Sequence, residues 1–154
     1  MQTGGSSVRQ LAFSATLHCL TGCAIGEVLG MVIGTGLGWS DAATIVLSVA
    51  LAFLFGYSLT LRPLLASGIA FAAAARLALA ADTLSITVME IVDNAIMLVI
   101  PGAMDAGPRS ALFWGNLVVA LSIAFVAAFP VNYWLIRRGR GHAVVHQHHG
   151  HHGH

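Results

Sequence analysis

The chain has 154 residues, of which 57% are hydrophobic and only 8% are charged, and its formal net charge is +1 with neutral histidines. Soluble domains usually carry about 25% charged residues, so this composition excludes an ordinary water-soluble domain and indicates an integral membrane protein. There is no lysine, and this charge balance argues against nucleic acid as a partner, which needs a clustered basic face, and points to the lipid bilayer.

Four apolar segments are long enough to cross a bilayer core of about 30 Å, which takes roughly 20 helical residues. They are residues 11–37, 42–59, 84–100 and 111–136. We therefore expect an all-α, polytopic membrane helical bundle with four transmembrane helices in a single membrane domain, residues 1–140. Ser40 or Asp41 is the expected cap of the second helix, and Asp82 is the expected N-cap of the third.

Residues 63–81 form a fifth apolar stretch that is rich in alanine and contains Arg76. Such a stretch can span or lie at the interface; we expect an interfacial helix over residues 64–80, with Arg76 reaching the headgroups. Four spans with both termini cytoplasmic place six arginines inside and only Arg109 outside, which satisfies the positive-inside rule. The expected location is the bacterial inner membrane. The six inside arginines are Arg9, Arg62, Arg76, Arg137, Arg138 and Arg140.

Two rows of residues follow the first predicted helix at a spacing of four. Cys19, Cys23 and Glu27 share one face, because residues four apart lie above one another on a helix. A second row begins at His18 and continues with four glycines, which allow another helix to approach closely. We expect this glycine row to form a homo-oligomer contact. The glycines are Gly22, Gly26, Gly30 and Gly34.

The third predicted helix carries a second polar face, formed by Glu90, Asp93, Asn94 and Met97 at positions i, i+3, i+4 and i+7. A carboxylate at mid-membrane costs about 2.5–3.5 kcal/mol on insertion scales unless it is compensated. Protons, water or a bound cation could compensate these groups. The face is therefore interpreted as a polar path or a second site, and the alternative is a buried polar network that only joins helices. We expect the first and third helices to be neighbours.

Thiolate and imidazole are soft or borderline ligands that suit copper(I) and zinc. We therefore interpret Cys19, Cys23, His18 and Glu27 as a candidate metal site. The alternative for the cysteines is plain packing, because free cysteine is readily buried as a small hydrophobic residue.

Residues 141–154 contain seven of the eight histidines and have low complexity. We expect a disordered, cytoplasmic tail that captures metal through neutral imidazoles, and the alternative is a purification tag. The expected capture residues are His146, His148, His149, His151, His152 and His154.

Three blocks, ATLHCLTGCAIGEVLGM, DTLSITVMEIVDNAIMLVIPGAMDAG and FPVNYWLIRRGRGHAVVH, resemble an uncharacterised family of small bacterial membrane proteins that is catalogued as a domain of unknown function. The likeness covers nearly all of residues 12–146. The resemblance implies an association with copper-handling proteins, which are sometimes joined to members or encoded near them. It supplies no ligand set and no activity.

The residues and the resemblance together predict a membrane protein that handles a soft transition metal, copper(I) before zinc, as a transporter or a membrane metal chaperone. We expect no enzyme activity and no nucleotide cofactor. Two alternatives stay open. One is a structural subunit of a membrane complex, and the other is a membrane thiol oxidoreductase, for which the spacing of Cys19 and Cys23 is unfavourable.

Overall fold

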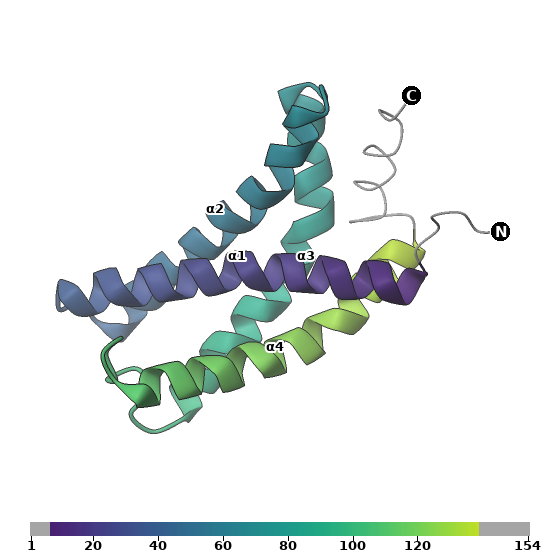
Figure 1. The fold of residues 1–154 in the computed structure, drawn as a ribbon. Coiled ribbons are helices and arrows are strands. Elements are labelled where there is room, and N and C mark those ends of the chain that lie inside the picture. Colours follow the sequence, from purple (N-terminus) through teal and green to yellow (C-terminus); the bar gives the residue numbers. More distant parts are fainter. Residues whose placement is uncertain (1–6, 139–154) are drawn as a thin grey trace.

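The computed structural model describes residues 7–138, which form four long α-helices and no strand (Figure 1). They are α1 (Val8–Gly36), α2 (Asp41–Ala66), α3 (Phe71–Val99) and α4 (Ala111–Arg137). The shortest has 26 residues and reaches about 39 Å at a rise of 1.5 Å per residue. All four are long and apolar enough to cross a membrane. The predicted all-α class with four membrane-spanning helices is confirmed.

The interfacial helix expected over residues 64–80 is wrong, because the chain reverses direction inside that stretch. α2 continues to Ala66, Gly68 turns the backbone with a φ of +89°, and α3 begins at Phe71. From Phe71 to Val99 the sequence contains no glycine or proline and opens with alanines, the strongest helix formers. The alanine-rich stretch is therefore the first part of α3, and Arg76 is exposed near its start.

The helix ends follow local signals that the sequence contains. Ser7 and Gln10 form a capping box at the start of α1, and the Ser40 side chain accepts a hydrogen bond from the Ala43 amide at the start of α2. Asp82, expected as an N-cap, lies well inside α3 instead. The reason is the same continuous helix, which leaves no terminus at residue 82.

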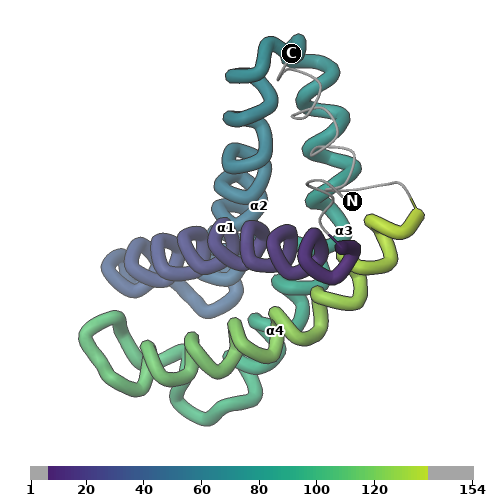
Figure 2. The backbone as a smooth tube through the Cα atoms, turned by 45° about the vertical axis from the view of Figure 1, so that its right-hand side comes forward, coloured from purple at the N-terminus to yellow at the C-terminus, as the bar shows by residue number. Residues whose placement is uncertain are grey.

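α1 and α3 each contact all three of the other helices, whereas α2 and α4 do not touch. α1 and α4 run side by side in opposite directions, and both ends of the described chain lie together (Figure 1). The α2–α3 hairpin leans away from this pair, so that its tip is remote from those ends in both views (Figure 2). Each pair closes with its own apolar cluster, around Ala12 and Ile136 in one and around Leu64 and Ala81 in the other.

The glycine row of α1 packs directly on α2. A Cβ placed on Gly22 would lie 2.7 Å from the Cα of Gly56, and one placed on Gly26 would lie 2.5 Å from the Cα of Ala52. Gly30 and Gly34 meet Ser48 and Thr44 in the same way.

The prediction that the glycines form a helix contact is confirmed, but their partner is α2 of the same chain. The glycine row is therefore filled by α2 within the chain, and the expected homo-oligomer stays a prediction.

Candidate functional site

The face of α1 that carries the cysteines points into the bundle, as its spacing predicts. Cys19 is fully buried, and Cys23 and Glu27 are each only 1% exposed. Met31 continues the row and packs against Phe113 of α4. These side chains lie about 100° around α1 from the glycine row, so α1 can present the glycines to α2 and the cysteines to α3 at the same depth.

The polar face of α3 also points inward. Glu90, Asp93, Asn94 and Met97 are all buried, and Asp93 is 1% exposed. α1 and α3 run in the same direction, with Cys19 beside Asp82 at one end of the contact and Glu27 beside Asp93 at the other. The prediction that the first and third spans are neighbours is confirmed.

Three carboxyl groups meet between α1 and α3. Glu27 interacts electrostatically with both Asp93 and Glu90. Oε2 of Glu27, Oε1 of Glu90 and both carboxylate oxygens of Asp93 are buried without a hydrogen bond of good geometry. All six arginines of residues 7–138 are exposed, so no arginine in this part of the chain neutralises the three groups.

Asn94 joins this group from one helical turn further along α3. Its side-chain amide donates to the carbonyl oxygen of Glu90 at 2.9 Å and to Oε2 of Glu90 at 3.3 Å. A pocket of about 300 Å³ between α2 and α3 is lined by Glu90 and Asn94 together with apolar side chains such as Val49 and Phe53. Of the three carboxyl groups, Glu90 is the one that lines this pocket.

Both cysteines are free thiols, and each contacts a different partner on α3. The Cys19 thiol donates to Oδ1 of Asp82 over 3.7 Å, and Sγ of Cys23 lies 3.9 Å from Sδ of Met89. Cys23 also interacts electrostatically with Glu90. The two thiols thus connect Asp82 at one end of a buried column to the carboxyl cluster at the other.

His18 belongs to the other side of α1. Its Nε2 lies 2.9 Å from Oγ1 of Thr60 on α2, in line with the glycine row. One residue rotates the side-chain direction by about 100°, so His18 faces α2 while Cys19 faces α3. The contact with Thr60 therefore directs the imidazole of His18 towards α2.

Within residues 7–138, no three histidine, cysteine, aspartate or glutamate side chains are grouped closely enough to hold a metal ion. The tail histidines proposed for metal capture lie outside the described residues.

Two residues of the buried column, Asp82 and Asn132, were not predicted from the sequence. Asp82 is fully buried. It lies on the same inward face of α3 as Ile86, Glu90 and Asp93. This face was not recognised at Asp82 because the helix was expected to begin there. Asn132 was also missed. An asparagine in an apolar helix predicts a buried hydrogen bond, but the sequence does not name its partner.

Asn132 ties three helices together. Its amide nitrogen donates to Oγ1 of Thr16 on α1 at 3.0 Å and to Oγ of Ser85 on α3 at 2.9 Å. Thr16 in turn donates to the carbonyl oxygen of Ala12 at 2.6 Å. This network closes the column on the side of the chain ends and holds α1, α3 and α4 in register.

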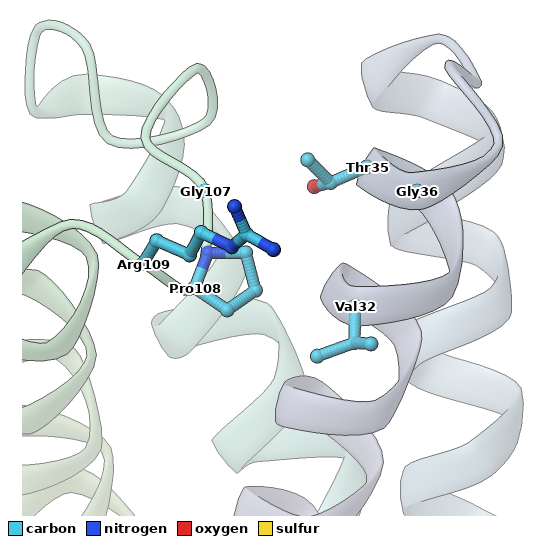
Figure 3. A pocket seen from close by; sticks show the side chains of 6 residues that line it. All are labelled: Val32, Thr35, Gly36, Gly107, Pro108 and Arg109. Carbon is cyan, nitrogen blue, oxygen red and sulfur yellow. The ribbon is translucent and has the colours of Figure 1, made fainter.

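A larger pocket of about 460 Å³ lies at the opposite end of the bundle, between the last turns of α1 and the loop before α4. Figure 3 shows the Arg109 side chain extending past Pro108 towards Thr35 of α1. The α1 residues that line this pocket, Val32, Thr35 and Gly36, come well after Cys19 and Cys23 along the helix. Among the described residues that line it, Arg109 is the only charged one.

Residues 9–141 match the family described as "Domain of unknown function (DUF4396)". No curated protein and no solved structure matches the chain. The match spans both polar helices and the whole described bundle. The chain therefore belongs to the DUF4396 family of unknown function.

Proposed function

We propose that this protein handles a soft transition-metal ion inside the membrane, copper(I) before zinc, as a transporter or a membrane metal chaperone. The observation that supports the proposal is the buried column between α1 and α3. It contains two free thiols, one thioether and three clustered carboxyl groups, and every arginine of residues 7–138 lies outside it.

The energetics of the column favour a cationic ligand. Buried charges are costly unless they are paired, and intramembrane carboxylates commonly line ion or proton pathways. Glu27, Glu90 and Asp93 have buried oxygens with unused acceptor capacity, and a cation or exchanging protons would satisfy them. In the proposal these three groups form the polar path.

The sulfur atoms favour a soft ion over a hard one. Thiolate and thioether ligands select copper(I), whereas magnesium and calcium prefer oxygen ligands. Cys19 and Cys23 are the proposed ligands. His18 is left out of the proposed ligand set because its imidazole bonds Thr60.

We propose a bacterial cytoplasmic membrane as the location, with both chain ends inside. Arg9 lies at the start of α1 and Arg137 at the end of α4. Arg62 and Arg76 flank the α2–α3 tip, and Arg109 lies in the loop between α3 and α4. An even number of spans puts the first two groups on one side, as the positive-inside rule requires. A periplasm-dependent reporter fused after residue 140 should be inactive; an active fusion would contradict this orientation.

Metal analysis of the purified protein tests the proposed function. The full-length chain is prepared in detergent with its seven tail histidines replaced by glutamine, hereafter the tail-neutral chain, and is loaded with copper(I) or zinc under reducing conditions. The parent should retain stoichiometric metal. The Cys19→Ser/Cys23→Ser double variant should melt at the same temperature but lose the metal, because serine keeps the size and not the soft sulfur.

Two results would contradict the proposal. Equal metal in the parent and in the double variant would mean that the cysteines only pack. No retained metal in either protein would favour the alternative of a structural subunit, in which the polar residues serve assembly.

A further inference from the structure

The side-chain sulfurs of Cys23 and Met89 face each other across the α1–α3 contact. Sγ of Cys23 lies 3.9 Å from Sδ of Met89, and the two side chains share one buried cluster with Cys19. Cys23 is 1% exposed and Met89 is fully buried. Methionine at a helix contact is commonly a packing residue, but the sulfur of Met89 directly faces a thiol.

The separation of the two sulfurs fits a shared ion. Sulfur ligands lie about 2.3 Å from a bound metal of this size. Two such sulfurs are about 4.0 Å apart when the metal is trigonal planar, and about 4.6 Å apart when the metal and both sulfurs lie in a line. The observed 3.9 Å therefore matches two ligands of one ion without a helix movement.

We propose that Met89 is a metal ligand, and that its thioether and the Cys23 thiolate form a two-sulfur site for a soft monovalent ion, namely copper(I). The inference rests on the proposed function and adds a ligand from α3 to it. Thioether sulfur binds copper(I) well and zinc poorly compared with thiolate, so the site discriminates between the two candidate metals.

Charge also favours a monovalent ion at this pair. Binding forms two copper–sulfur bonds, and the Cys23 thiol proton is released to the surrounding buffer. One thiolate and one copper(I) ion then leave no net charge on the pair. Zinc would leave one positive charge on the pair, and a second anion such as Glu90, which interacts with Cys23, would have to neutralise it. Cys19 is a further sulfur ligand in the same cluster, and its present contact with Asp82 would be given up if it joined.

The chain offers a matched control at Met97. Met97 is fully buried on the same helix as Met89, but it packs in a different cluster with Ala103 and Ala120. Leucine replaces methionine in protein cores with little change in volume. Met89→Leu and Met97→Leu should therefore perturb packing equally, while only the first removes a sulfur beside Cys23.

X-ray absorption at the copper edge tests the ligand directly. The tail-neutral chain is produced with selenomethionine in place of methionine and loaded with copper(I) under reducing conditions. We expect a copper–selenium shell in the parent and in Met97→Leu, and its loss in Met89→Leu. Copper–sulfur scattering from Cys23 should remain in all three.

The outcomes separate this inference from the proposed function. Copper held through the cysteines in a parent that has no copper–selenium shell would overturn the role of Met89 and leave the proposed function standing, whether or not the leucine variants fold. A shell that persists in Met89→Leu would assign another methionine and also overturn it. A parent that retains no copper would contradict both.

Discussion

Two of the helix contacts of α1 have opposite character, although they lie at the same depth. Its contact with α2 is built from small residues, with Gly22 against Gly56 and Gly26 against Ala52. Its contact with α3 contains thiols and carboxyl groups, several of whose oxygens are buried without a hydrogen bond. The first contact is what close packing in a membrane favours, whereas the second tolerates groups that oppose folding.

A short membrane protein can keep buried carboxyl groups in its interior when another face of the same helix is closely packed. Close backbone approach between α1 and α2 maximises dispersion contacts along one face. That packing can offset the cost of burying Glu27, Glu90 and Asp93 on the other face. Stability and chemistry are thus assigned to different faces of one helix, and substitutions on the two faces should have effects of opposite sign.

The largest expected effect is a loss of folding when the packing face is disrupted. In Gly26→Leu the new Cβ would overlap the backbone of Ala52 and Leu51, and backbone cannot move aside as a flexible side chain can. We expect a destabilisation of about 4 kcal/mol or more, measured as thermal unfolding in detergent. Gly115→Leu is the control, because nothing lies within 4 Å of its Cβ position; equal melting of both variants would refute the α1–α2 contact.

The second prediction has the opposite sign. Asp93→Asn removes a buried carboxyl group that faces Glu27 and whose oxygens lack good hydrogen bonds. We expect the metal-free protein to gain roughly 1–2 kcal/mol, as is common when a strained functional group is neutralised. Asp105→Asn, at an exposed loop position, should leave the melting temperature unchanged. A destabilised Asp93→Asn would mean that the carboxyl groups form a structural network.

The smallest expected effect concerns the polar ties within the column. Asn132→Leu removes two interhelical hydrogen bonds, to Thr16 and Ser85. Such bonds average about 0.6 kcal/mol in membranes, so we expect a loss of about 1 kcal/mol in detergent unfolding. Ser122→Ala, whose hydroxyl bonds only the carbonyl oxygen of Val118 on an exposed face, should change little. If the two variants lose equal stability, Asn132 does not join the helices.

The sequence allowed correct prediction of the fold class and of the inward faces of α1 and α3, because helical spacing fixes which residues share a face. It did not identify the partner of the glycine row, since close approach alone does not name the neighbour. A complementary signal exists on α2, where the small residues Thr44, Ser48, Ala52, Gly56 and Thr60 also recur every fourth position. Matching these two rows would have predicted the α1–α2 contact.

The start of α3 and the site residues that depend on it were not predictable in the same way. Hydropathy with an internal arginine fits an interfacial helix as well as the first turns of a long span. Because of that ambiguity, Asp82 was predicted at a helix end, and its contact with Cys19 was not predicted. The position of Met89 opposite Cys23 requires the rotation of α3 against α1, which only tertiary packing sets.

We propose that the α3-facing side of α1 binds a soft ion and that the α2-facing side does not. A competition titration of the tail-neutral chain with a chromophoric copper(I) chelator tests it most directly. Cys19→Ser/Cys23→Ser should bind copper(I) at least roughly 100-fold more weakly than the parent, because removal even of groups that support metal ligands costs 10–100-fold. His18→Gln, on the α2-facing side, should bind like the parent. Equal affinity in the parent and the double serine variant would contradict the claim.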